Sequence, residues 1–455
     1  VPLCIGGIHP KEGAIHLVSC PSRWVALKRK CNPPSHTAYK DTDIPWLGQI
    51  PAHWQTRRLK FIATVTMGQS PDSKTYNDQG IRPPFLQGNG EFGPPEVGAH
   101  HPTPRQFCPT APRLCHPGDL LLSVRAPVGA LNIADQDYGI GRGLCAIQLH
   151  AELDGDFAWY AFQITRHQLH MAATGSTYDA VSVADVKAMV CPLPPLPEQR
   201  AIATFLDRKT ANLDALTRKY ERILDVLREP RAHLVSRAVT QGLDPDVAMQ
   251  DTRIPWLGQI PAHWETRRLK FLAEITMGQS PNSEECNDRG VGPPFLQGNA
   301  EFGDPQAGDR HPTPRQFCPT APKLCASNDL LLSVRAPVGA LNIADQVYGI
   351  GRGLCAITAD GEALDLGFTW YALQLTHHAL QAVATGSTYD AVSLGEVEDM
   401  LCPLPPLPEQ RTIAAALDRE TAHLDPLAAK VRAIIARLAE YRTALITAAV
   451  TGKPW

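Results

Sequence analysis

The strongest constraint on the fold of this chain is that most of its sequence occurs twice. "DTDIPWLGQIPAHWQTRRLKF" from Asp41 returns as "DTRIPWLGQIPAHWETRRLKF" from Asp251, an offset of 210 residues. "PLPPLPEQR" from Pro192 returns letter for letter from Pro403, an offset of 211, because one residue is inserted near 360–364. A unit of about 210 residues is far longer than the roughly 20–50 residues of solenoid repeats. The sequence therefore predicts two copies of a whole domain-plus-helix module.

The composition is that of a globular protein and excludes several other classes. Of the 455 residues, 44% are hydrophobic and 20% charged, which suffices for a sizeable core. The net charge of -3 argues against a protein that coats nucleic acid unaided, so DNA binding would need local patches or partners. No apolar run approaches the roughly 18–20 residues of a membrane span, and the first 40 residues lack a signal-peptide layout. We expect a cytoplasmic protein.

Eight of the twelve cysteines fall at matching positions in the two modules. The pairs are Cys108/Cys318, Cys115/Cys325, Cys145/Cys355 and Cys191/Cys402. Their apolar or proline-rich neighbours predict buried free thiols rather than disulfides. "FCPTAPRLC" and "FCPTAPKLC" space two cysteines seven apart, with His101 or His311 upstream, but zinc sites usually use tighter pairs. We therefore predict no metal site.

Each module contains two kinds of sequence pattern, which together predict an α+β fold. Short apolar runs between glycines and prolines indicate strands, and 157–174 has helical spacing. After "PLPPLP" the pattern becomes that of one long helix, with Pro197 and Glu198 in its first turn. We expect a poorly ordered leader (1–39), a first mixed domain (40–196), a first helix (197–241), a linker with the second domain (242–407) and a second helix (408–455).

The two long helices carry a heptad pattern. Apolar residues fall seven apart at Leu206, Leu213, Tyr220, Leu227 and Leu234, and again at Leu417, Leu424, Val431, Leu438 and Leu445. The other half of the seam is predicted at Ile202, Leu216, Ile223, Ile413, Leu427, Ile434 and Tyr441. Each helix would hold about 42 residues, and Pro230 should bend the first. Five heptads favour pairing of the helices with each other, although each could pack on its own domain alone.

Antiparallel pairing of these helices would relate the two modules by a local twofold axis, with the domains at opposite ends of a rod. DNA also has twofold axes perpendicular to the duplex, so such a protein could place each domain on an inverted half-site at a fixed separation. The fold expected is thus two duplicated mixed domains joined by a long antiparallel coiled coil with pseudo-twofold symmetry.

These motifs, in this order and repeated, resemble a known family. "IPWLGQIPAHWQTRRLKF", "PLPPLPEQRAIATFLDRKTANLDAL" and "SRAVTQGL", with their second copies, are similar to the domain starts, helix starts and helix ends of specificity subunits of type I restriction-modification systems. The resemblance covers about residues 40–455. Pro230 and the leader depart from the family pattern.

The resemblance implies a non-catalytic subunit with two target recognition domains, each reading one half of a bipartite site on double-stranded DNA. It also implies that the helices hold two adenine-methylating (modification) subunits, and that the larger complex recruits ATP-driven restriction subunits that translocate and cleave DNA. S-adenosylmethionine, ATP and Mg would then belong to these partners, and this chain would hold no cofactor of its own.

No motif of the chain predicts catalysis. "CNPPSH" at 31–36 lacks the aromatic residue of an adenine methyltransferase loop and has no glycine-rich cofactor turn upstream, and "YGIGRG" lacks the spacing of a dinucleotide fingerprint. A GxxxxGK[ST] loop is absent, so ATP is not expected to bind here. We predict no catalytic residue.

Polar side chains of the types that contact DNA occur in glycine-rich stretches of both modules. Gln and Asn can read adenine, Arg can read guanine, and hydroxyls commonly contact phosphate, whereas the alternative for each is a turn-stabilising role. The candidates are Gln69, Ser70, Gln87, Asn89, Arg125, Arg142, Ser176, Thr177 and Tyr178, with Gln279, Ser280, Gln297, Asn299, Arg335, Arg352, Ser387, Thr388 and Tyr389 in the second module.

Because most of these stretches are identical, the two half-sites should be the same or nearly so, in inverted orientation. The modules diverge mainly at 72–82 against 282–292 and at 93–100 against 303–310, so one half-site could differ by a position. The alternative from another class is a duplicated coiled-coil scaffold that does not read DNA.

Overall fold

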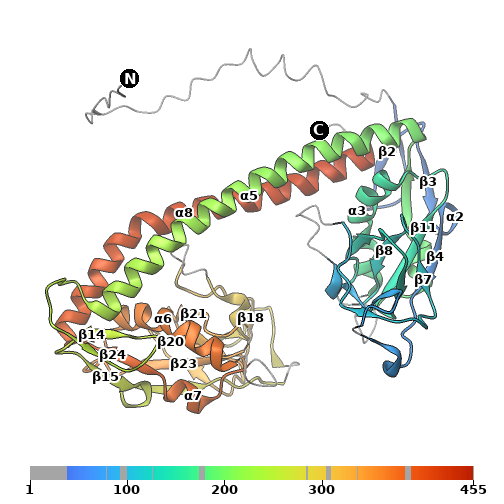
Figure 1. Cartoon of the computed structure of the whole chain (residues 1–455). Helices are drawn as coiled ribbons and strands as arrows, with labels where there is room; N and C mark the ends of the chain where they lie inside the picture. Colours follow the sequence, from blue (N-terminus) through green and yellow to red (C-terminus); the bar gives the residue numbers. More distant parts are fainter. Residues whose placement is uncertain are drawn as a thin grey trace, which may run out of the picture. The chain divides into compact units, whose positions relative to one another are not determined.

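The computed structural model of the chain describes residues 38–77, 79–92, 100–125, 127–173, 180–282, 285–303, 309–335, 337–384 and 391–453 (Figure 1). Most of the predicted leader therefore lies outside the described residues. The chain forms two compact units: Val1–Leu216 with Leu438–Trp455, and Thr217–Arg437. Each unit thus combines one globular repeat with parts of both long helices.

The first unit contains short strands and three helices before the first long helix. Its elements are β1 (Tyr39–Asp41), β2 (Gln49–Pro51), β3 (Gln55–Arg58), α2 (Leu59–Ile62), β4 (Ala63–Met67), η1 (Ser73–Thr75), β5 (Pro84–Leu86), η2 (Asn89–Glu91), β6 (Gln106–Phe107), β7 (Leu114–Cys115), β8 (Leu120–Ser123), β9 (Leu131–Ile133), β10 (Tyr138–Ile140), β11 (Leu144–Leu149), α3 (Gly155–Ala173), α4 (Val183–Ala188) and β12 (Val190–Leu193).

The second unit repeats this order, with a 3-10 turn in place of α2. Its elements are β13 (Met249–Asp251), β14 (Gln259–Pro261), β15 (Glu265–Arg268), η4 (Leu269–Phe271), β16 (Ala273–Met277), β17 (Pro294–Leu296), η6 (Asn299–Glu301), β18 (Gln316–Phe317), β19 (Leu324–Cys325), β20 (Leu330–Ser333), β21 (Leu341–Ile343), β22 (Tyr348–Ile350), β23 (Leu354–Ala359), α6 (Leu366–Ala384), α7 (Leu394–Glu398) and β24 (Leu401–Leu404).

Each globular part is built on two four-stranded sheets. In the first unit one sheet has the antiparallel order β4-β11-β8-β9, and the other has the order β6-β5-β10-β7, in which β5 and β10 run parallel. The second unit gives the equivalent orders β16-β23-β20-β21 and β18-β17-β22-β19. The predicted α+β class with two duplicated mixed domains is therefore confirmed.

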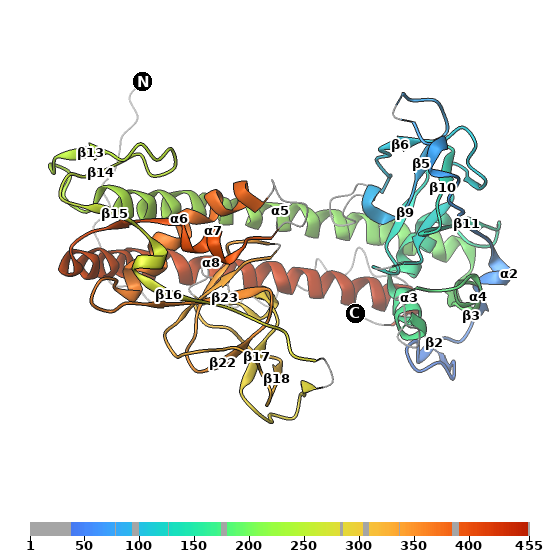
Figure 2. The ribbon, with the colours of Figure 1, turned by 90° about the horizontal axis from the view of Figure 1, so that it is seen from below.

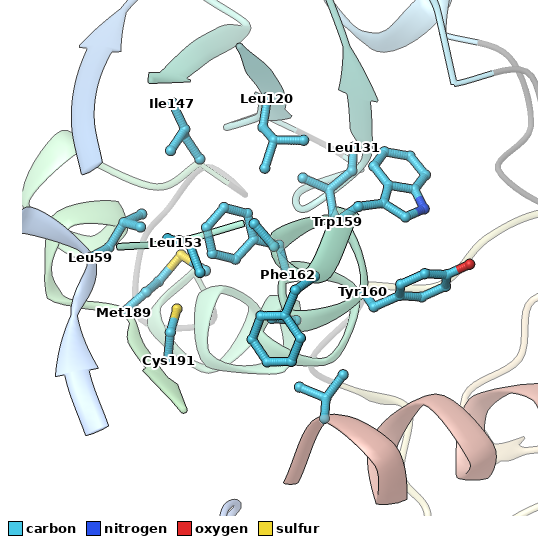
Figure 3. Close-up of a cluster of buried hydrophobic side chains, with 14 of the residues drawn as sticks. Leu59, Leu120, Leu131, Ile147, Leu153, Trp159, Tyr160, Phe162, Met189 and Cys191 are labelled. Carbon is cyan, nitrogen blue, oxygen red and sulfur yellow. The ribbon is translucent and has the colours of Figure 1, made fainter. Parts of the chain in front are cut away.

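The first of these sheets is buried on both faces. Along β8, Leu120 and Leu122 belong to one core while Leu121 belongs to another, because successive side chains of a strand point to opposite faces. Figure 3 shows the larger core, in which Leu120 and Ile147 of the sheet face Phe162 of α3. The smaller core lies with the second sheet and includes Tyr138 of β10. Burial on both faces explains why the "LLLS" of β8 is apolar without alternation.

The prediction of buried free thiols is confirmed for the eight matched cysteines. All eight are buried and none is in a disulfide. Burial raises the pKa of Cys145 and of Cys191 to about 12. In the described part of the chain, no three His, Cys, Asp or Glu side chains gather in a way that could hold a metal ion.

The two long helices are α5 (Leu196–Gln241, 46 residues) and α8 (Leu407–Thr451, 45 residues). Each is somewhat longer than expected and is followed by a glycine with positive φ, Gly242 or Gly452, a conformation that ends helices readily. Pro230 lies within α5, and the helix continues through it. None of the helices in the described ranges combines the length and apolar character that a membrane span requires.

The helices run antiparallel, as contacts within each unit show (Figures 1 and 2). In the first unit, Leu206 near the start of α5 shares a core with Leu445 near the end of α8. In the second unit, Val239 near the end of α5 shares a core with Ile413 near the start of α8. The start of one helix meets the end of the other in both units, so the antiparallel pairing expected from the sequence is confirmed.

The predicted second half of the seam is wrong at Leu216, Leu427 and Tyr441, which are 39%, 47% and 55% exposed. The buried row lies one residue further along each helix, four residues after the first row. Its members Leu224, Arg231, Ala238, Ala428 and Ala449 are buried, and Thr217, Ile435 and Arg442 are partly buried. The row was missed because several of its members are small or charged, while apolar residues happen to stand beside them.

Leu206, Leu417, Val431 and Leu445 of the first row are buried, and the other members of that row are partly buried. In the second unit Leu224, Ala428 and Val431 form a small core of their own.

Two arginines of this row, Arg231, which is buried, and Arg442, which is partly buried, form reciprocal contacts. In the second unit Arg231 of α5 donates from Nε to Asp425 of α8 (2.8 Å) and from a terminal nitrogen to Gln374 of α6 (3.1 Å). In the first unit the positions are exchanged: Arg442 of α8 lies 3.4 Å from Asp214 of α5 and donates to Gln163 of α3 (3.4 Å). Arg231 and Arg442 occupy equivalent positions of the repeat, as do the two aspartates and the two glutamines. Each module thus supplies the arginine that completes the other module's polar cluster, as in an isologous interface.

Candidate nucleic-acid interface

In the second module a cavity of about 230 Å³ gathers the side chains that were predicted from separate stretches of sequence. Its lining comprises Gln297, Gly298, Asn299, Ser333, Arg335, Arg352 and Gly353. Four of the seven are candidates named from the sequence, and Gln297, Arg335 and Arg352 are exposed to solvent. The fold thus brings together polar groups that are up to 55 residues apart, counted from Gln297 to Arg352.

Strand ends explain this convergence. β17 ends at Leu296, directly before Gln297, and its parallel neighbour β22 ends at Ile350, two residues before Arg352. The carboxyl ends of two paired parallel strands lie at one edge of a sheet, so both side chains arise there. Arg335 follows the end of β20 in the other sheet and reaches the same cavity.

Glycines let the three backbone segments approach closely. A Cβ on Gly351 would lie 2.9 Å from the carbonyl oxygen of Gln297, and one on Gly278 would lie 2.2 Å from the carbonyl oxygen of Gly351. Neither position has room for a side chain without movement of backbone atoms. These close contacts explain why "MGQS" and "GIGRG" contain glycine next to the polar candidate residues.

Ser280 connects the polar side chains of the second module. Its hydroxyl accepts hydrogen bonds from Gln297 Nε2 (3.1 Å), Arg352 Nε (3.3 Å) and the Arg352 backbone nitrogen (3.3 Å). Gln279 is held beside it by a backbone hydrogen bond to Ile350 (2.9 Å). Four of the sequence candidates therefore belong to one connected cluster.

The first module repeats the arrangement. Gln87 follows β5, Arg142 follows its parallel partner β10, and Arg125 follows β8. Gln69 bonds through its backbone to Ile140 (2.8 Å), and the Ser70 hydroxyl accepts from the Arg142 backbone nitrogen (3.4 Å). Asn89 and Asn299 begin the short turns η2 and η6.

The candidates in "TGSTYD" are not described. Ser176, Thr177, Tyr178, Ser387, Thr388 and Tyr389 lie outside the described residues. The residues that follow them, Ala180 and Ala391, form bridges with Arg125 and Arg335.

Two residues were not predicted from the sequence: Ser333, which lines the cavity, and Tyr76, whose ring packs against Phe85 of β5, two residues before Gln87. Ser333 gave no signal because it ends a fully buried strand, where its hydroxyl donates to the carbonyl of Arg335 (2.9 Å). Tyr76 did carry a signal, since it is one of the positions at which the two modules differ: its counterpart is Cys286.

Comparison with known proteins decides the family. The family described as type I restriction modification DNA specificity domain matches residues 51–224 and 261–430, which together make up most of the chain. The chain belongs to this family. Each match covers one globular part and a portion of the long helix that follows it, so a specificity domain here is one module of the repeat.

Individual relatives agree with this assignment. The chain is 34% identical over 251 residues to a putative specificity subunit of the type I restriction enzyme MjaX of Methanocaldococcus jannaschii, covering 54% of this chain and 56% of the relative. It is 27% identical over 192 residues to the EcoBI specificity subunit of Escherichia coli, covering 42% of this chain and 39% of the relative. The chain thus spans little more than half the length of the first relative and less of the second.

The fold of the specificity domains also matches a solved structure. A chain from a structural study of complex assembly and conformational transition in the type I R-M system is 25% identical, with a TM-score of 0.51. The similarity covers 89% of this chain and 99% of that chain.

Proposed function

We propose that this protein is the non-catalytic DNA-sequence specificity subunit of a type I restriction-modification complex, with each specificity domain reading one half of a bipartite site. Membership of the specificity family supports this, and so does the presence of the same Gln, Asn and Arg set beside paired strand ends in both domains. Glutamine and asparagine suit adenine, and arginine suits guanine, in the major groove.

The observation that carries the proposal is the reciprocal pairing of the helices. The same contact is made twice: Arg231 of the first module pairs with Asp425 of the second, and Arg442 of the second module pairs with Asp214 of the first. Each contact lies within one unit, and the two modules contribute equivalent residues to it with exchanged roles. Two copies of one reading domain that share such a pair of helices suit two half-sites in inverted orientation, with the helices fixing the spacer between them.

The remaining parts of the complex follow from the same proposal. With a net charge of -3, this chain supplies little of the cationic surface that phosphate neutralisation requires, so partners should contribute it. We assign these roles to two methyltransferase subunits docked on the helices and to restriction subunits that translocate DNA, all in the cytoplasm. S-adenosylmethionine, ATP and Mg would bind to those partners.

Methylation sequencing tests the proposal. The chain is expressed with its methyltransferase subunits in a host without adenine methylation, and modified adenines are mapped across the genome. We expect a bipartite motif with a fixed spacer and inverted, nearly identical half-sites. Arg142→Ala should relax only the first half-site and Arg352→Ala only the second, so each variant is the matched control of the other. A complex that methylates without any bipartite motif, or that shows no sequence-selective DNA binding, would contradict the proposal.

A further inference from the structure

The two modules differ at the contact between each globular part and the long helix that follows it. Arg310 ends the segment 303–310, one of the stretches in which the modules diverge, and its counterpart in the first module is His100. The backbone carbonyl of each residue accepts a hydrogen bond from an edge strand, either from Ile343 of β21 (2.7 Å) or from Ile133 of β9 (2.6 Å). The backbone at this position is therefore held in the same way in both modules, while the side chain differs.

The Arg310 side chain connects this sheet edge to two helices. One terminal nitrogen donates to the Tyr371 hydroxyl of α6 (2.9 Å) and to a carboxylate oxygen of Asp418 on α8 (2.8 Å). The guanidinium also lies over the rings of Trp370 and Tyr371, with 5.6 Å and 5.4 Å between Cζ and the ring centroids. Because the arginine side chain is only 25% exposed and stacks on aromatic rings, this contact is stronger than an isolated surface ion pair. We call it the arginine clamp.

The groups that bind the arginine have counterparts in the first module. Tyr160 of α3 donates to Asp207 of α5 (2.8 Å), as Tyr371 donates to Asp418 (2.8 Å). Both modules therefore join their globular part to the long helix by a hydrogen bond between a tyrosine and an aspartate. The second module adds an arginine to this pair.

His100 makes a different contact in the first module. Its ring packs against that of Trp159, which lies next to Tyr160 on α3 (Figure 3), with 4.4 Å between the ring centroids. The Nδ1 atom of His100 is buried and has no hydrogen-bond partner in the described part of the chain. Within the same described ranges, no hydrogen bond or ion pair joins His100 to Asp207. The first domain thus meets its helix without the clamp.

We propose that Arg310 is a positioning residue that fixes the second specificity domain on α8, whereas the first domain, with His100 in its place, is held less rigidly on α5. The inference rests on the proposed function and refines it, because the orientation of a domain on its helix decides where its half-site must lie. The clamped domain accepts one position of its half-site, and the unclamped domain adapts to several.

The length of the spacer between the half-sites is the property that this difference affects. One base pair more or fewer shifts a half-site by about 3.4 Å along the duplex and rotates it by about 34°. To bind such a site, the protein must move a domain on its helix or deform the DNA, and both cost free energy. Removing the clamp should therefore weaken the discrimination between natural and altered spacers, and adding a second clamp should strengthen it.

Exchange of the two residues tests the inference in the intact complex with its methyltransferase subunits. Methylation sequencing first gives the motif, and affinities are then measured for duplexes with the natural spacer and with one base pair more or fewer. Arg310→His should reduce the ratio of these affinities by roughly tenfold, because hydrogen bonds of a charged group are lost. His100→Arg should increase the ratio, since Tyr160 and Asp207 are already in place to bind the guanidinium.

Matched variants separate positioning from a general loss of stability. Asp418→Asn removes the charge that binds Arg310 and should lower spacer discrimination as Arg310→His does. Asp207→Asn makes the same change in the module without the clamp and should lower it less. Arg315→Ala removes a nearby exposed arginine and should leave the ratio unchanged. Each ratio compares two duplexes on one preparation, so a uniform loss of active protein cancels.

The outcomes bear on separate claims. An unchanged spacer preference in folded Arg310→His and Asp418→Asn, or equal effects of Asp207→Asn and Asp418→Asn, would overturn this inference but leave the specificity function standing. If Arg310→His does not fold, His100→Arg decides, because it leaves the second module intact: an unchanged preference in this variant also overturns the inference. A wild-type complex with no bipartite motif would instead refute the proposed function itself.

Discussion

We expect Arg231→Ala to destabilise the second unit strongly, because it leaves a buried carboxylate without its counter-charge. The Arg231 and Asp425 side chains are only 8% and 7% exposed, and their charged atoms are 2.8 Å apart. Breaking a buried pair by removing one partner costs about 3–5 kcal/mol, most of it from the charge left behind. The loss of the hydrogen bond to Gln374 adds to the effect.

The magnitude can be converted into a melting temperature. The second unit runs from Thr217 to Arg437, which is 221 residues by subtraction. For domains of this size each kcal/mol shifts the Tm by about 2–4 °C, so the unit should melt roughly 6–20 °C lower. Differential scanning calorimetry is the suitable assay, since a chain with two units need not unfold in one step. Arg442→Ala should cost less, because Arg442 and Asp214 are 16% and 15% exposed and 3.4 Å apart.

Two comparisons make the test decisive. Arg237→Ala removes an exposed arginine from the same helix and should change stability by no more than about 0.5 kcal/mol. Arg231→Met combined with Asp425→Leu removes both charges and should recover most of the lost stability. If Arg231→Ala melts like Arg237→Ala, or if the double variant is no better than the single one, the argument from burial is refuted.

Three further predictions concern a glycine contact, a histidine and a thiol. Gly278→Ala should destabilise the second unit by about 1–3 kcal/mol in urea unfolding, because the added Cβ would lie 2.2 Å from a backbone oxygen. Gly298→Ala is the control: a Cβ at Gly298 would have no atom within 4 Å, so this variant should be nearly neutral. Burial lowers the pKa of His100 in the folded state, so the unfolded chain binds the proton more readily. Stability should therefore fall as the pH drops below about 6.5, and the wild type should lose more stability than His100→Gln between pH 7 and 5.5. Equal losses in the two proteins would contradict this. Cys145, whose pKa burial raises to about 12, should resist alkylation at pH 8 in the folded protein and react only after unfolding, as site-resolved mass spectrometry can show; modification without unfolding would refute its burial.

Much of the candidate site could be predicted from sequence, for a definite reason. Binding residues lie disproportionately in loops, and "GQS", "LQGN" and "GIGRG" combine polar residues with the glycines that turns favour. The sequence could not show which of these side chains lie together in the folded chain. Gln297 and Arg352 meet because β17 and β22 are parallel neighbours, and strand pairing across more than 50 residues leaves no local pattern in the letters.

The sequence by itself determined that the chain is one module used twice, that each module is a mixed domain followed by a long helix, and that the eight matched cysteines are buried thiols. These properties depend on repetition, periodicity and local composition, which are visible along the chain. Only the tertiary structure decided which second row of each helix is buried, and that Arg231 and Arg442 lie within it. A heptad pattern identifies only apolar residues as members of the interface. A charged residue can also lie there when a residue of opposite charge on the other helix pairs with it, and which residue that is depends on how the two helices pack.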